Sequence, residues 1–98
     1  MKNVSEKELV FEMVKEIIDN EFPSEFDSHE FIKKFIWNYP VPYGRLLIKH
    51  ENVATAHAEI SNYLRNYADR LGIEQITPKK ESEDIFGNEN ENAKWKKK

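Results

Sequence analysis

The chain has 98 residues, a formal net charge of −3 and no cysteine, with 39% hydrophobic and 34% charged residues. A chain of this length closes one apolar core, and its composition is that of a globular protein with a highly charged surface, so we expect a single soluble domain. Without cysteine, disulfides and thiolate chemistry are excluded, and apolar runs of only a few residues exclude a membrane-spanning helix. We therefore expect a cytoplasmic protein.

The charge is unevenly distributed along the chain. Residues 1–76 contain nine Lys or Arg and thirteen Asp or Glu, whereas 77–98 contain six Lys and five acids. A negative overall charge gives no general attraction to nucleic acid or to an anionic membrane. We therefore expect no membrane partner, and any binding of nucleic acid has to come from a local group of residues.

The first helix is predicted over about 6–20. Ser5 and Glu8 have the spacing of a capping box, in which two side chains satisfy backbone amides that the first turn leaves unpaired. Pro23 ends the helix, because proline has no amide hydrogen and disfavours helical geometry in the residue before it. The apolar residues with helical spacing are Val10, Met13, Val14, Ile17 and Ile18.

A second helix is predicted over 28–38, where Asp27 and Glu30 again have capping-box spacing. Pro40 and Pro42 follow this helix and end its apolar pattern. Pro42 also suits the first position of a third helix, which is predicted over 43–50. The apolar run in that third segment also fits a strand. The second helix carries its apolar stripe on Phe31, Ile32, Phe35 and Ile36.

The most regular helical pattern covers 53–71. Apolar residues recur there in steps of three and four, and Gly72 then offers the left-handed conformation that ends many helices. The inner face is therefore structural, whereas the outer face carries Ser, Asn and Arg. The inner positions include Val53, Ala56, Ile60, Leu64 and Leu71.

After Gly72 the helical pattern stops. The letters IEQIT fit a short strand, PKKES a turn, and EDIFGN a second short strand or a loop. The remainder has no periodic apolar face, so we expect 77–98 to be a polar, partly disordered C-terminal tail. Ile85, Phe86 and Trp95 are exceptions that predict anchoring, either on the helical body or in a partner.

These elements predict an all-α or mainly α fold. The helical domain spans 1–76 and has three or four helices, with a short C-terminal β-hairpin as a winged-helix-like alternative. The expected core consists of Val10, Met13, Val14, Ile17, Phe31, Phe35, Leu47, Ile60, Leu64 and Leu71.

Aromatic residues are concentrated around the second helix, with seven of them between positions 22 and 43. They either cover the joint between the second and third helices or form a protein-binding patch or homodimer seam, since aromatic anchors contribute much of the energy of interfaces. By elimination we expect a non-catalytic interaction protein whose partner is another protein or a second copy. The interface candidates are Trp37, Tyr39, Tyr43, Ile85, Phe86 and Trp95.

The alternative is a DNA-binding regulator with a winged helix-turn-helix. The predicted order of helices followed by a hairpin fits that architecture, with 53–71 as the reading helix. However, its first turns contain Ala54, Thr55, Ala58 and Glu59 and no cation. The DNA-contact candidates are Thr55, Ser61, Asn62, Arg65, Asn66, Lys79 and Lys80.

Catalytic and metal-binding patterns are weak. The three glycines lie far apart, which excludes a phosphate-binding loop, and the acids near the C-terminus lie in a segment expected to be solvated. His50 and His57, with Glu51 and Glu59 nearby, do not have a common zinc spacing. We therefore predict no enzyme activity, no metal, no cofactor and no small-molecule substrate.

Overall fold

The computed structural model describes residues 9–83 and 89–98, except for the side chains of 77–83 and 89–92. The elements follow in the order α1 (Phe11–Glu21), β1 (Glu25–Asp27), α2 (Ser28–Asn38), α3 (Pro40–His50), α4 (Val53–Asn66), α5 (Ala68–Leu71), β2 (Ile73–Glu83) and β3 (Glu89–Lys97). The mainly helical class with a C-terminal hairpin is confirmed, and β1 adds a third strand that the sequence analysis did not predict.

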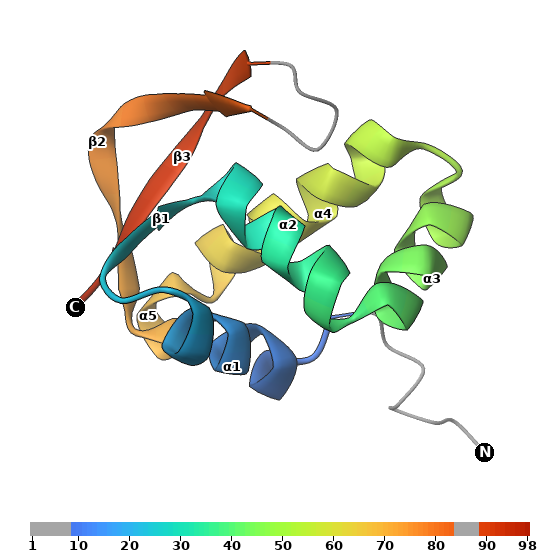
Figure 1. The fold of residues 1–98 in the computed structure, drawn as a ribbon, viewed down its shortest axis with the longest axis horizontal. Helices are drawn as coiled ribbons and strands as arrows, with labels where there is room; N and C mark the ends of the chain where they lie inside the picture. Colours follow the sequence, from blue (N-terminus) through green and yellow to red (C-terminus); the bar gives the residue numbers. More distant parts are fainter. Residues whose placement is uncertain (1–8, 84–88) are drawn as a thin grey trace.

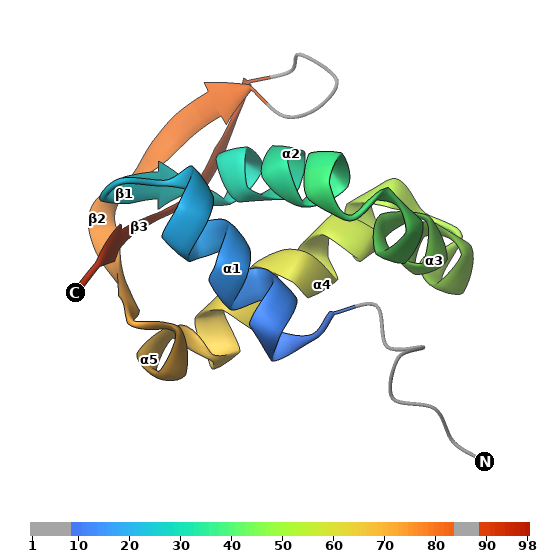
Figure 2. The same ribbon diagram turned by 60° about the horizontal axis from the view of Figure 1, so that its bottom comes forward.

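The sheet lies along one side of the helical body, and α3 lies at the end of the molecule away from it (Figures 1 and 2). Its strand order is β1-β3-β2, so the last strand in the sequence is the central one. Both pairings are antiparallel. Among the helices that the structure describes, none has the length and apolar character needed to cross a membrane.

The helix α2 begins where its capping chemistry predicts. Asp27 Oδ1 accepts a hydrogen bond from the Glu30 amide, and Glu30 Oε1 accepts one from the Asp27 amide, both at 2.8 Å. This capping box fixes the first turn of α2 directly after β1. The predicted span 28–38 is confirmed.

The other two early helices begin at different residues from those predicted. Helix α1 begins at Phe11, so the predicted start near residue 6 is wrong; Ser5 and Glu8 lie outside the described residues. Helix α3 begins at Pro40, three residues earlier than predicted, because a proline in the first helical turn has no amide to satisfy. The helical interpretation of this segment is therefore confirmed and the strand alternative is wrong.

The predicted helix over 53–71 is interrupted at Tyr67. This residue has φ −112° and ψ 15°, which separates α4 from α5. The interruption is local, since the Tyr67 amide still donates to the Tyr63 carbonyl and the Leu71 amide donates to the Tyr67 carbonyl. Gly72 has φ 75° and ends α5 in the left-handed conformation, as predicted.

The predicted turn at PKKES is wrong, because this segment lies within strand β2 of the hairpin. Backbone pairing of β2 with β3 runs from Ile73 opposite Lys97 to Glu83 opposite Glu89. The register shifts between Ile76 and Lys80, a region that contains Pro78. Because proline cannot donate to a strand ladder, it produces an irregularity within β2 rather than a turn.

Most of the predicted core is buried. Met13 and Leu47 are only partly buried against it, and Val10 is also partly exposed. The buried residues that were predicted are Val14, Ile17, Phe31, Phe35, Ile60, Leu64 and Leu71. Those missed by that core list are Leu9, Ile18, Phe22, Phe26, Ile32, Tyr43, Leu46, Ala56, Ile73, Ala93 and Trp95.

The expected loose tail over 77–98 is the largest error of the sequence analysis. Residues 89–97 form the central strand, and Trp95 in that strand is only 1% exposed. Trp95 lies opposite Phe26 of β1, and its Nε1–H donates to Ser28 Oγ at 3.2 Å. A buried indole needs such an acceptor, so this hydrogen bond ties β3 to the first residue of α2.

The alternation of a strand explains the error. Successive side chains of a strand point to opposite faces. Ala93 and Trp95 are buried. Lys94 and Lys96, which alternate with them, form ion pairs with residues of the neighbouring strands. Only two apolar residues therefore mark the buried face of β3, and the helical period does not detect them.

Replacing Trp95 by Ala is expected to lower the free energy of unfolding by about 3–5 kcal/mol, because it leaves a large cavity in the core. The matched control is Trp37→Ala, which removes an 82% exposed indole and should change stability by about 0.5 kcal/mol or less. Urea unfolding followed by circular dichroism measures both. If Trp95→Ala does not fold, Ser28→Ala provides a milder test, with an expected loss of about 1–3 kcal/mol. Equal effects of the two tryptophan substitutions contradict this packing.

Candidate functional site

The three aromatic candidates near the second helix have different environments. Trp37 is 82% exposed at the C-terminal end of α2. Tyr39 is partly buried, and its hydroxyl donates to Glu16 Oε1. Tyr43 is buried, and its hydroxyl lies 2.8 Å from Nε2 of His57 on α4. The prediction of Tyr43 as a surface contact is therefore wrong, because this side chain joins α3 to α4.

The candidates in the C-terminal segment do not form a described surface. Trp95 lies in the core, so it anchors β3 on the helical body and is unavailable to a partner. Ile85 and Phe86 lie outside the described residues. Among the interface candidates that lie within the described residues, Trp37 is therefore the large side chain that is mostly exposed to solvent.

Two further exposed apolar residues, Val41 and Ile48, lie on α3. They are 62% and 76% exposed, and with Trp37 they are the large exposed hydrophobic residues in the described part of the chain. Val41, Arg45 and Ile48 follow helical spacing and share one face of α3, opposite the buried Leu46. The sequence analysis missed Val41 and Ile48, although this spacing was a usable signal.

We call this surface the α2–α3 corner and define it by Lys33, Trp37, Val41, Arg45 and Ile48. All five side chains are exposed. Lys33 precedes Trp37 by four residues and therefore lies on the same face of α2. Figures 1 and 2 show that α2 leads into α3 at the end of the molecule away from the sheet.

The segment that forms the corner is basic in an acidic protein. Residues 31–50 contain four Lys or Arg and no Asp or Glu, while the rest of the chain contains eleven Lys or Arg against eighteen acids. Lys34 pairs with Glu21 and Lys49 pairs with Glu59, each at 3.4 Å. Lys33 lies one helical turn before Trp37 on α2, and Arg45 lies between Val41 and Ile48 on one face of α3. The corner thus combines large apolar side chains with positive charge.

Contacts with neighbouring helices hold the corner in place. Asn38 at the end of α2 donates to Glu21 Oε2 at 3.3 Å and to the Lys34 carbonyl at 2.8 Å. Tyr39, in the single-residue connection between α2 and α3, is held by Glu16 of α1. The backbone that carries Trp37 and Val41 is therefore fixed to α1 before any partner arrives.

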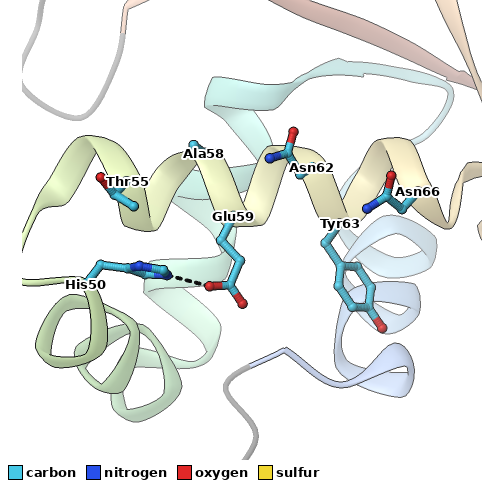
Figure 3. Close-up of a pocket in the computed structure, with 7 residues that line it drawn as sticks. All are labelled: His50, Thr55, Ala58, Glu59, Asn62, Tyr63 and Asn66. Carbon is cyan, nitrogen blue, oxygen red and sulfur yellow. Dashed lines mark hydrogen bonds and ion pairs between the residues drawn. The ribbon is translucent and has the colours of Figure 1, made fainter.

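The outer face of α4 forms a shallow groove of about 430 Å³. Figure 3 shows Thr55, Asn62 and Asn66 along the helix, with His50 reaching from α3 towards Glu59. His50 Nε2 lies 2.5 Å from Glu59 Oε1. The groove is lined mainly by polar side chains: His50, Thr55, Ala58, Glu59, Asn62, Tyr63 and Asn66.

The DNA-contact candidates on α4 are only partly brought together. Thr55, Asn62, Arg65 and Asn66 are exposed, whereas Ser61 is partly buried. Arg65 donates to Asn62 Oδ1 at 2.7 Å, so the one cation among these α4 candidates is held within the helix. Lys79 and Lys80 lie on β2, and their side chains are outside the described part of the chain.

The basic C-terminal letters KWKKK do not form a free cationic surface. Lys94 pairs with Glu25 at 3.2 Å, and Lys96 pairs with Glu74 at 3.5 Å. Lys98 pairs with Asp69 at 3.0 Å. These exposed pairs contribute little to stability, but they place an acid beside three of the four lysines, and Lys97 Nζ donates to the Asp19 carbonyl at 3.5 Å. Electrostatic attraction of this strand to phosphate is correspondingly reduced.

The two histidines considered as metal ligands have different partners. His50 faces Glu59, and His57 lies beside the Tyr43 hydroxyl. Within the described residues, no group of three or more His, Asp or Glu side chains has an arrangement suited to a metal ion. The four residues His50, Glu51, His57 and Glu59 are thus not brought together as one site.

The contact between Tyr39 and Glu16 has an electrostatic consequence. The hydrogen bond to Glu16, followed by partial burial and the negative charge of that carboxylate, raises the pKa of Tyr39 from 10.0 to about 12. Burial also raises the pKa of Tyr43 above its usual value. Both effects favour the neutral phenol, which keeps its proton for donation.

The pKa of Tyr39 predicts a change of stability at high pH. Because the folded-state value lies above the unfolded value of 10.0, the stabilisation is complete below pH 10 and declines as the pH rises through about 12. Ultraviolet titration of tyrosinate should therefore show one group ionising near pH 12. Tyr39→Phe should remove that group, and Glu16→Gln should shift it towards its usual value. An unchanged ionisation near pH 12 in Tyr39→Phe contradicts the assignment.

The described surface therefore offers two distinct regions: the apolar and basic α2–α3 corner, and the polar groove along α4. Function is inferred from the residues and charges of these two regions. No protein-family model matches this chain, and comparison with curated proteins and with solved structures also finds no match.

Proposed function

We propose that this protein is a non-catalytic interaction module that binds a protein partner through the α2–α3 corner. The observation that supports it is the placement of Trp37, Val41 and Ile48, the large exposed hydrophobic residues of the described chain, within twelve consecutive positions. Exposed apolar groups that cluster in this way are typical of contact surfaces, whereas single ones are ordinary.

The chemistry of the corner suits an interface. A tryptophan contributes a large contact area and is enriched among the residues that dominate binding energy. Arg45 beside Val41 and Ile48 adds a side chain type that is also enriched at such sites. Because Tyr39 and Asn38 already fix the backbone here, binding requires little ordering of the corner, which favours affinity.

The absence of catalysis and the cytoplasmic setting are part of the same proposal. Both derive from the sequence, which has no cysteine and no glycine-rich phosphate loop. The α4 groove adds no support for catalysis, since its acid, Glu59, is already paired with Lys49 and His50.

The test is capture of partners from cytoplasmic extract on immobilised protein. We expect Trp37→Ala/Ile48→Ser to weaken binding of a captured protein by about 30-fold, which corresponds to a loss of roughly 2 kcal/mol. Both side chains are exposed, so the variant should fold normally. The matched control is Arg65→Ala/Asn66→Ala, which alters exposed residues of α4 and should retain the protein. Equal capture by wild type and the corner variant contradicts the proposal.

A second candidate function is sequence-specific DNA binding through α4. It is supported by the order of α3, α4 and the β2–β3 hairpin, and by the exposed Thr55, Asn62 and Asn66 on the outer face of α4. The charge distribution argues against it, because Arg65 is engaged with Asn62 and three lysines of the C-terminal strand region are ion-paired.

Gel-shift titration at several salt concentrations tests this second candidate. If α4 and the hairpin contact phosphates, Arg65→Ala/Lys79→Ala should weaken binding and reduce the slope of log affinity against log salt by roughly two. The corner variant Trp37→Ala/Ile48→Ser serves as the control with normal DNA binding. An unchanged slope, or no shift at low salt, rules the candidate out.

A further inference from the structure

Arg70 on α5 differs from the other cations of the described chain in what holds it. Its Cζ lies 5.1 Å from the centre of the Phe11 ring and 5.6 Å from the centre of the Tyr67 ring. Among the described residues, Arg70 forms no ion pair, although its side chain is exposed. The lysines that do have ion pairs there are Lys15, Lys34, Lys49, Lys94, Lys96 and Lys98.

The rings beside Arg70 are themselves held by the fold. Tyr63, Tyr67 and Arg70 follow one another in steps of four and three, which places them on one side of α4 and α5. The rings of Tyr63 and Tyr67 stack with their centres 4.4 Å apart, and Phe11 approaches from the start of α1. All three rings are half-buried and pack on the core. We call the surface formed by Phe11, Tyr63, Tyr67 and Arg70 the aromatic–arginine stack.

A guanidinium that lies over aromatic rings is suited to an oxyanion. Its five N–H donors lie in one plane and match two oxygens of a carboxylate or a phosphate at once. The rings contact the face of the group, which leaves its edge for those hydrogen bonds. Because the rings also restrict the side chain, less conformational entropy is lost when an anion binds. Arg70 is therefore positioned for an anion that its own chain does not supply within the described residues.

The Tyr63 hydroxyl lies in the same electrostatic environment. Burial raises its pKa above the usual value, Tyr67 and Glu12 raise it further, and Arg70 lowers it. The phenol therefore stays neutral at physiological pH and keeps a proton to donate. Glu12 is the acid that opposes an incoming anion here, whereas Asp69 beside Arg70 is paired with Lys98 at 3.0 Å.

We propose that the aromatic–arginine stack binds an oxyanion, a carboxylate or a phosphate, carried by a peptide of a partner protein. A net charge of −3 disfavours a polyanion such as nucleic acid, and the half-buried rings offer contact area to the apolar part of a peptide. The inference goes beyond the function proposed above, because it concerns a different surface. Figures 1 and 2 show α5 and α3 at opposite ends of the helical body.

Nuclear magnetic resonance titration of the isotope-labelled full chain gives the first test. The probes are three short peptides of one sequence, with phosphoserine, glutamate or glutamine at the central position. We expect the two anionic peptides to shift the Arg70 Nε–H signal and the amide signals around the stack, and the glutamine peptide to bind about tenfold more weakly. The tighter of the two anionic peptides identifies the preferred oxyanion. If neither shifts these signals, or if all three bind equally, the proposal is overturned.

Substitutions of Arg70 separate its planar group from its charge. Arg70→Lys keeps the charge but loses the two-pronged contact, so it should weaken binding about tenfold, and Arg70→Gln should weaken it further. The matched control is Arg65→Gln, which removes the same charge from an exposed position on α4 and should change binding by about twofold or less. Equal losses in Arg65→Gln and Arg70→Gln show general electrostatic attraction and reject the site. Both arginines are exposed, so these variants should fold normally.

The rings and the competing acid provide two further readouts. Phe11→Leu keeps an apolar side chain but removes one ring, and it should weaken binding although Arg70 is still present. Glu12→Gln should strengthen binding about two- to threefold, because it removes a nearby negative charge. The corner variant Trp37→Ala/Ile48→Ser should bind the anionic peptides as the wild type does. Weaker binding in Glu12→Gln, or wild-type binding in Phe11→Leu, is against the proposal.

Discussion

The position of β3 between β1 and β2 is the constraint on which the rest of the structure depends. Trp95 of this strand fills the core beside Phe26, and its indole hydrogen bonds to Ser28 at the start of α2. The same few residues therefore close the sheet, cover the helical core and fix the beginning of α2. The direction of α2 in turn determines where Trp37 and the α2–α3 corner lie.

The sequence predicts the helices well where local chemistry decides their limits. The Asp27–Glu30 capping box and the left-handed Gly72 each involve residues within one turn, and both are as predicted. The strands are different, because β1 has only three residues and β3 reveals its buried face through Ala93 and Trp95 alone. Their stability comes from pairing with distant strands, which no local pattern contains.

The candidate site shows the same division. Of the aromatic residues named as interface candidates, Trp37 lies on the surface, as that hypothesis requires. Tyr43 has the same side chain class and a similar place in the sequence, yet its partner His57 lies fourteen residues away on another helix. Whether such a residue faces solvent depends on how α3 packs on α4. Val41 and Ile48 were detectable, since a strictly helical reading of 40–50 places them opposite Leu46.

The sheet also has a consequence for the order in which the molecule assembles. The contact between Trp95 and Ser28 joins residues 67 positions apart, and the Lys97 amide reaches back to the Ser24 carbonyl. Closing so long a stretch of chain costs entropy before any packing is gained. During synthesis, the helices emerge from the ribosome before β3. One side of their apolar core therefore stays uncovered until β3 pairs with β1 and β2.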